Sequence, residues 1–157
     1  MASEKKIRIV PKENAVFWMD KNGTWHNEHG KFEHPRIIRH FNLAIQKDDL
    51  GYHLSQVTDG VEEKVYFPHE DAVLFVVDIS ESQEVTLTLN TTQTMTLDPE
   101  QLFTRDDNLY LQTPEHCIKF SQHALVKLSR HMEETDGNFC LVLNHISHTI
   151  PEKPRQT

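Results

Sequence analysis

Residues 17–32, FWMDKNGTWHNEHGKF, decide the fold, because a later stretch of the chain has a similar order of residues. Residues 103–120, FTRDDNLYLQTPEHCIKF, also start and end on phenylalanine. Each stretch is followed by a helical pattern and then by a turn, at DDLGYHL (48–54) and at TDGNFCL (135–141). The order of these features predicts a chain in which one structural unit is used twice.

The predicted division is an N-terminal repeat unit over residues 1–80 and a C-terminal repeat unit over 81–157, in one compact globular body with a groove between the halves. Short alternating runs predict strands through most of both units. The run at 73–79 is apolar on both faces, which is typical of a central strand. Helical spacing of apolar residues occurs in one place per unit: Ile37, Ile38, Phe41, Ala44 and Ile45, then Leu125, Leu128 and Met132. The sequence therefore predicts an α+β fold of two strand-rich units, each with one helix and mostly antiparallel sheet.

The Asn22-Gly23 dipeptide predicts a tight type I′ turn between two strands, with positive φ at both residues. Trp18 and Trp25 flank this turn and are expected to lie near each other. Two interpretations of the tryptophans stay open: they anchor the hairpin in the core, or they form an aromatic patch for a ligand or a protein partner.

The charge balance of the 157-residue chain argues against two classes of partner. It has 24 acidic and 16 basic residues, a formal charge of −8, which disfavours nucleic acid and anionic membrane surfaces. No apolar run approaches the roughly 20 residues that span a bilayer, and residues 1–10 contain no apolar signal segment. Cys117 and Cys140 lack C-x-x-C spacing and are expected to be buried thiols. We therefore expect a cytoplasmic protein.

Three short segments occur in an order that is known from one family. Residues 20–25 read DKNGTW, residues 49–54 read DLGYHL, and residues 70–78 read EDAVLFVVD. This order resembles the DGTW turn, the DGY-L turn and the EDAPF strand entry of the bacterial domain-of-unknown-function 1285 family, over roughly residues 16–79. The resemblance implies an α+β fold built from repeated motifs and a role in signal transduction or regulation. It supplies no catalytic residues.

No catalytic signature was found in the chain, and no cofactor is predicted. There is no G-x-S-x-G elbow and no glycine-rich phosphate loop. The favoured hypothesis is a non-catalytic module that binds a small molecule or a protein segment. The predicted ligand-binding residues are Trp25, Arg36, Arg39 and His40, because the turn and the helix face bring them together and arginine suits anionic groups.

Two alternative functions remain open at the level of sequence. The first is a metal-dependent enzyme that uses His26, Glu28 and His29, with help from His145 or His148, since imidazole and carboxylate groups are zinc ligands. The second is a structural homo-oligomer subunit, such as a homodimer, formed through an exposed sheet edge.

Overall fold

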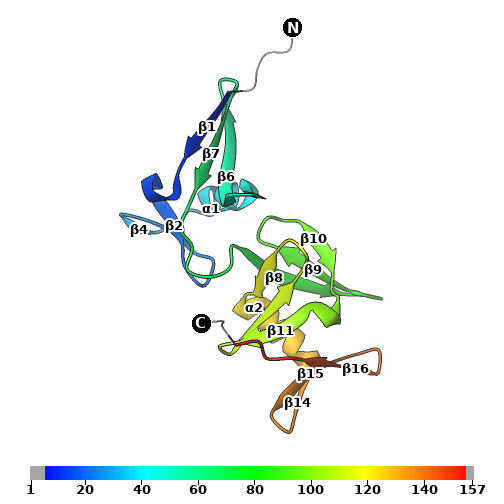
Figure 1. The fold of residues 1–157 in the computed structure, drawn as a ribbon. Coiled ribbons are helices and arrows are strands. Elements are labelled where there is room, and N and C mark those ends of the chain that lie inside the picture. The colour runs from blue at the N-terminus through cyan, green and yellow to red at the C-terminus, as the bar shows by residue number, and fades with distance from the viewer. Residues whose placement is uncertain (1–5, 155–157) are drawn as a thin grey trace. The chain divides into compact units, whose positions relative to one another are not determined.

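The computed structural model describes residues 6–154 and divides the chain into two compact units, Met1–Val73 and Leu74–Thr157 (Figure 1). The division falls immediately before strand β8 (Leu74–Glu81), which pairs with two strands of the second unit.

Over residues 6–73, the first unit contains eight elements besides a short 3-10 turn, η1 (Lys12–Asn14). They are β1 (Lys6–Val10), β2 (Phe17–Met19), β3 (Trp25–Asn27), β4 (Gly30–Lys31), α1 (Pro35–Leu43), β5 (Ile45–Asp48), β6 (Gly51–Thr58) and β7 (Val61–Tyr66). Strands β2, β3 and β4 form one small antiparallel sheet. The second sheet has the order β1-β7-β6-β5, in which β1 is parallel to β7 and the other pairs are antiparallel.

The second unit, described over residues 74–154, begins with β8 and continues through β9 to β16, with one α-helix in this range. Its further elements are β9 (Val85–Leu89), β10 (Thr94–Thr96), η2 (Pro99–Gln101), β11 (Leu102–Arg105), β12 (Asn108–Gln112), β13 (Cys117–Phe120), α2 (Gln122–Leu128), η3 (Ser129–His131), β14 (Met132–Thr135), β15 (Asn138–Leu143) and β16 (Ile146–Ile150). Six strands form a sheet in the order β10-β9-β8-β13-β12-β11, and β14, β15 and β16 form a second sheet. The predicted central strand is confirmed, because β8 lies inside the large sheet with most of its apolar residues buried.

Both units have the same elements in the same order. In each unit a parallel bridge, called the closing contact below, joins the first meander to the segment after the last strand. Each has a three-stranded meander (β2–β4 or β11–β13), then a helix, then a second meander (β5–β7 or β14–β16). In the first unit, the N–H of Met19 donates to the carbonyl of Pro68 at 3.0 Å and its carbonyl accepts from Glu70 at 3.0 Å. In the second unit, Thr104 makes the same pair of bonds, with Pro151 and Lys153, both at 2.9 Å. Parallel bridges Met19–His69 and Thr104–Glu152 result.

The two helices differ in how deeply they are buried. Helix α1 starts with Pro35 at its first position, where a missing N–H has no cost, and none of its residues is fully buried. Helix α2 starts after Ser121, whose hydroxyl accepts a bond from the N–H of Ala124 at 3.2 Å, and it buries Ala124 and Leu128. No helix within residues 6–154 is long and apolar enough to cross a membrane.

The predicted α+β class with mostly antiparallel sheet is confirmed, whereas the predicted helix ends are wrong. The apolar spacing predicts that Ile45 belongs to the first helix, but α1 ends at Leu43 and Ile45 starts β5. Met132 was assigned to the second helix and instead starts β14. In both units the first residue of the strand after the helix pairs with a residue across a hairpin, Ile45 with Leu54 and Met132 with Leu141. This strand pairing outweighs the helical spacing of the apolar residues.

The predicted type I′ turn at Asn22-Gly23 is also wrong. Gly23 has a positive φ of 81°, but Asn22 does not, and the loop between β2 and β3 spans residues 20–24. The carboxylate of Asp20 shapes this loop by accepting bonds from the N–H groups of Asn22 (2.8 Å) and Thr24 (3.0 Å). Such local side-chain bonds stabilise a wider loop than the dipeptide alone predicts.

Candidate ligand-binding site

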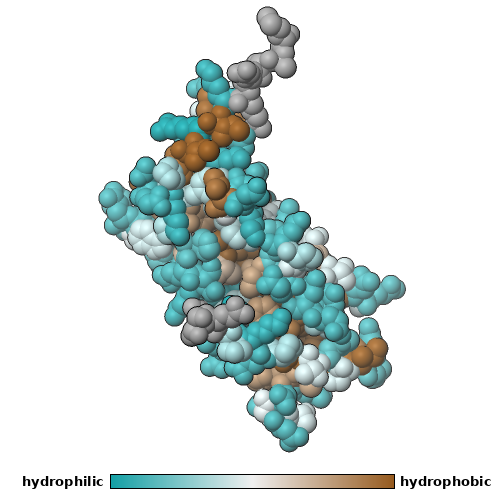
Figure 2. All heavy atoms as spheres, viewed as in Figure 1, coloured by the Kyte–Doolittle hydropathy of each residue, from teal (hydrophilic) through white to brown (hydrophobic). Residues whose placement is uncertain are grey.

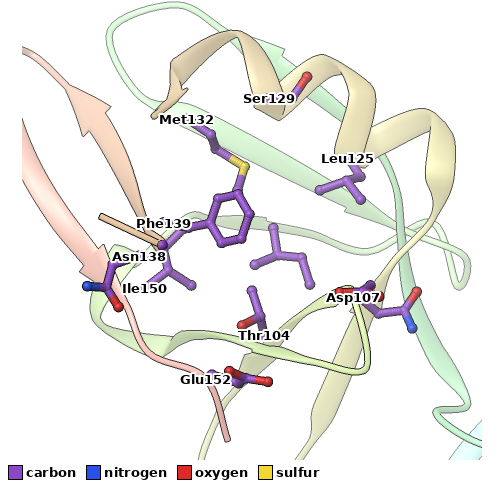
Figure 3. A pocket seen from close by; sticks show the side chains of 12 residues that line it. Thr104, Asp107, Leu125, Ser129, Met132, Asn138, Phe139, Ile150 and Glu152 are labelled. Carbon is purple, nitrogen blue, oxygen red and sulfur yellow. The ribbon is translucent and has the colours of Figure 1, made fainter. Parts of the chain in front are cut away.

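The second unit contains a cavity of about 530 Å³ that opens between α2, the β11–β12 hairpin and the β14–β16 meander (Figure 3). Twelve residues line it: Thr104, Asp107, Asn108, Leu109, Leu125, Ser129, Met132, Gly137, Asn138, Phe139, Ile150 and Glu152. Figure 3 shows the ring of Phe139 pointing into the space, with Met132 and Leu125 on one side and Thr104 on the other. The cavity lies wholly within one unit.

Two tight hairpin turns hold polar residues at the cavity. Asp106 and Asp107 join β11 to β12 with φ of 50° and 63°, and Asp136 and Gly137 join β14 to β15 with φ of 53° and 81°. Positive φ at both central residues is the geometry of a two-residue hairpin turn, which aspartate and glycine tolerate best. These turns fix Asp107 beside the cavity and start β15 so that Phe139 faces it.

The lining combines an apolar floor with acceptor groups. Leu109 and Ile150 are buried, while the Phe139 side chain is 40% exposed because it borders the open space. The charged lining residues are Asp107 and Glu152, both acidic. Because like charges repel, this cavity suits a neutral or cationic molecule better than an anionic one.

Trp25, the first predicted ligand-binding residue, lies in the core of the first unit with 1% of its surface exposed. Its indole N–H donates to the side-chain oxygen of Asn42 at 2.8 Å, and its ring packs edge-on against Phe41 and Phe67. The expected proximity of the two tryptophans is wrong, because Trp18 pairs with His26 and stacks on its ring, while Trp25 pairs with Met19. The two side chains therefore lie on opposite faces of the hairpin.

The other three predicted binding residues share one helix. Arg36, Arg39 and His40 are exposed on α1, and their spacing of three and four residues puts them on one face. His40 also lines a cavity of about 100 Å³ beside α1. The ligand-binding role of these residues and of Trp25 stays a prediction.

The residues of the metal-site hypothesis, His26, Glu28 and His29, do not form one cluster in the described part of the chain. His26 bonds to the carboxylate of Asp20 at 2.7 Å, while His29 and Glu28 form an exposed pair at 3.3 Å. Burial acts to raise the pKa of Asp20, but the hydrogen bonds from His26, Thr24 and Asn22 outweigh it, and the pKa is lowered. Among residues 6–154, no three His, Cys, Asp or Glu side chains are grouped so that they could hold a metal ion.

A cluster of titratable side chains that sequence reasoning missed ties three strands of the first unit together. Asp48 of β5 accepts bonds from the Tyr66 hydroxyl (2.6 Å) and the Lys64 ammonium (3.3 Å) of β7. The buried ring of His53 in β6 lies 3.8 Å from the same carboxylate, and its Nε2 has no hydrogen-bond partner within the described residues. The Tyr66 bond is the main cause of a lowered pKa at Asp48. We assign this cluster a structural role, since its members bind one another across β5, β6 and β7.

The bond to Asp48 raises the pKa of Tyr66 to about 12. Its contribution to stability is therefore complete below the ordinary tyrosine value of 10.0 and is lost as pH rises through about 12. In the Asp48→Asn variant the Tyr66 pKa is expected to return toward 10.0, measured by the ¹³Cζ shift of tyrosine against pH. Asp49→Asn, at the exposed neighbouring residue, is the control. A Tyr66 titration that is identical in both variants would contradict this role for Asp48.

Comparison with known proteins supports the fold. No protein-family model matches the chain, and no curated protein matches it. It is similar to the crystal structure of a DUF1285 family protein from Silicibacter pomeroyi DSS-3, with a TM-score of 0.64 and 18% identity over 92% of this chain and 83% of that one. It is also similar to a DUF1285 family protein from Shewanella baltica OS155, with a TM-score of 0.51 and 21% identity over 71% of this chain and 87% of that one. The resemblance found in residues 16–79 is thereby confirmed at the level of the fold.

Proposed function

We propose that this chain is a remote member of the DUF1285 family and a non-catalytic module that binds a small molecule in the cavity of its second unit. The observation that carries the proposal is the cavity itself. A volume of about 530 Å³ falls within the range of roughly 300–1,000 Å³ that is typical of small-molecule sites. An apolar floor with a few polar groups at the edge is also the usual composition of such sites. Ligand binding of this kind fits a regulatory protein of the cytoplasm.

The experiment is a thermal-shift screen of the full chain against neutral, cationic and anionic fragments. A binder is expected to raise the Tm, and at equal concentration a tighter binder raises it more, because the ligand binds only the folded state. Phe139→Ala, which removes a wall of the cavity, is expected to weaken binding at least about tenfold, the loss that follows from roughly 1.4 kcal/mol of apolar contact. Ile146→Ala, at another exposed apolar residue outside the lining, is the matched control. Equal binding by both variants would refute the proposed site.

A second candidate function is the binding of an anionic partner by α1. It is favoured by the exposed basic face that Arg36, Arg39 and His40 form on this helix. Arginine pairs with carboxylate and phosphate groups through two parallel hydrogen bonds. The Arg36→Ala/Arg39→Ala double variant is expected to lose any binding of polyanionic probes such as heparin. Unchanged retention on a heparin column would remove this candidate.

A third candidate is self-association through the first unit. Ile7 and Ile9 of β1 are both more than half exposed, and apolar side chains gather around this strand in Figure 2. An exposed apolar strand at a sheet edge favours pairing with another copy. Light scattering tests this candidate: Ile7→Lys/Ile9→Lys is expected to convert a dimer into a monomer, and a monomeric parent chain would exclude it.

A further inference from the structure

Each unit has its own closing contact, the parallel bridge Met19–His69 in the first and Thr104–Glu152 in the second. Superposing these two bridges matches the units residue by residue. Met19 and Thr104 occupy the same place, since each makes the bridge to the segment that follows the last strand. The residue that pairs with Met19 on the neighbouring strand is Trp25, and the residue that pairs with Thr104 is Leu109. Leu109, which lines the cavity, therefore stands where the first unit has Trp25.

The surroundings of Trp25 and Leu109 match as well. Phe67 and Ile150 each precede the proline of the closing contact. Asn42 and Ser129 each lie three residues before the strand that follows the helix. Three pairs thus correspond, with the first-unit residue given first: Trp25 and Leu109, Phe67 and Ile150, Asn42 and Ser129.

In the first unit these places are filled by side chains. The Trp25 indole, with its N–H bonded to Asn42, packs edge-on against Phe67 with the ring centres 4.9 Å apart. In the second unit each of the three residues is smaller, and all three line the 530 Å³ cavity. The cavity of the second unit therefore corresponds to the space that Trp25, Phe67 and Asn42 fill in the first unit.

We infer that the cavity of the second unit binds a flat aromatic molecule with an N–H donor, neutral or cationic, in the place that the Trp25 indole fills in the first unit. This inference rests on the proposed function and adds the class of ligand. The Ser129 hydroxyl donates its proton to the carbonyl of Val126 at 2.6 Å, so its oxygen can only accept a further hydrogen bond. The carboxylates of Asp107 and Glu152 supply further acceptors and disfavour an anion.

The test uses methionine methyl groups labelled with ¹³C in the full chain. Met132 lines the cavity, whereas Met19 is buried in the filled core of the first unit and is the internal control. Indole and tryptamine are expected to shift the Met132 methyl signal and leave Met19 unchanged. 1-Methylindole, which lacks the N–H, is expected to bind about three- to tenfold more weakly, the loss of one hydrogen bond. Indole-3-acetate, an anion, is expected to bind more weakly than tryptamine.

Two variants fill the cavity from the protein side. Leu109→Trp copies the first unit and is expected to abolish the indole shift and raise the Tm. Ile150→Phe copies Phe67, is the smaller change should the first variant fail to fold, and is expected to weaken indole binding. Val126→Trp adds the same side chain at an exposed residue of α2 outside the lining and is expected to bind indole like the parent.

The outcomes separate this inference from the proposed function. If hexylamine or hexanoate shifts Met132 more strongly than indole does, the cavity binds ligands but the aromatic class is wrong. If indole binds equally to the parent, Leu109→Trp and Ile150→Phe, the match between Trp25 and Leu109 does not locate the ligand. If none of these probes and no fragment of the thermal-shift screen binds, both the inference and the proposed function are refuted.

Discussion

Replacement of Trp25 by alanine is expected to lower the free energy of unfolding by about 3–5 kcal/mol, the range for large aromatic residues removed from a core. The side chain is fully enclosed by Phe17, Phe41 and Phe67, so its removal leaves a cavity. The variant also leaves the side-chain oxygen of Asn42 without the indole donor, which adds to the loss. Urea unfolding followed by circular dichroism measures the change.

Trp18→Ala is the matched control for this prediction, because it removes the same side chain one strand away. Trp18 is 38% exposed and stacks on His26, so its loss is expected to cost less than about 1 kcal/mol. Added indole is expected to restore part of the stability of Trp25→Ala, because it can occupy the vacated space and bond to Asn42. Equal losses in the two variants would contradict the assignment of Trp25 to the core.

Leu128→Ala in α2 is expected to destabilise the protein by about 2–5 kcal/mol. Leu128 is 0% exposed, at the end of the helix that packs on β8 and β13, so the truncated side chain leaves a cavity in the core. Chemical unfolding of purified protein gives the value.

Val126→Ala supplies the comparison on the same helix. Val126 is 65% exposed, and substitutions at exposed residues usually change stability by no more than about 0.5 kcal/mol. A small effect at both residues would mean that α2 does not hold the second unit together, and would also remove its role as a fixed wall of the cavity.

The class of the fold was predictable because strand periodicity and turn residues are local signals. The apolar run of β8 identified the inner strand of the large sheet without any knowledge of its partners. The helix ends were not predictable in this way. Ile45 and Met132 continue the apolar spacing of the preceding helices, and only their hairpin partners, which lie in strands further along the chain, make them strand residues.

The cavity was not predictable from the sequence, although the similarity between residues 17–32 and residues 103–120 is visible there. When the two stretches of sequence are aligned on Phe17 and Phe103, Trp25 is matched with Leu111. The strand register sets it against Leu109 instead, because the loop from β2 to β3 is longer than the turn from β11 to β12. A cavity that depends on one residue being smaller than its counterpart becomes visible only when that register is known. Trp25 likewise could not be assigned between core and surface until Asn42 was placed beside it.

The closing contact of each unit has a consequence for the speed of folding. Its flanking hydrogen bonds join residues 49 positions apart in the first unit, Lys21 to Glu70, and 48 positions apart in the second, Arg105 to Lys153. The entropy lost on closing a loop depends on the logarithm of its length, so both units face nearly the same kinetic barrier from chain closure. Helices of nine and seven residues contribute few short-range contacts that could form earlier. Relaxation after a denaturant jump should therefore occur in milliseconds to seconds rather than in microseconds, with similar rates for the two units.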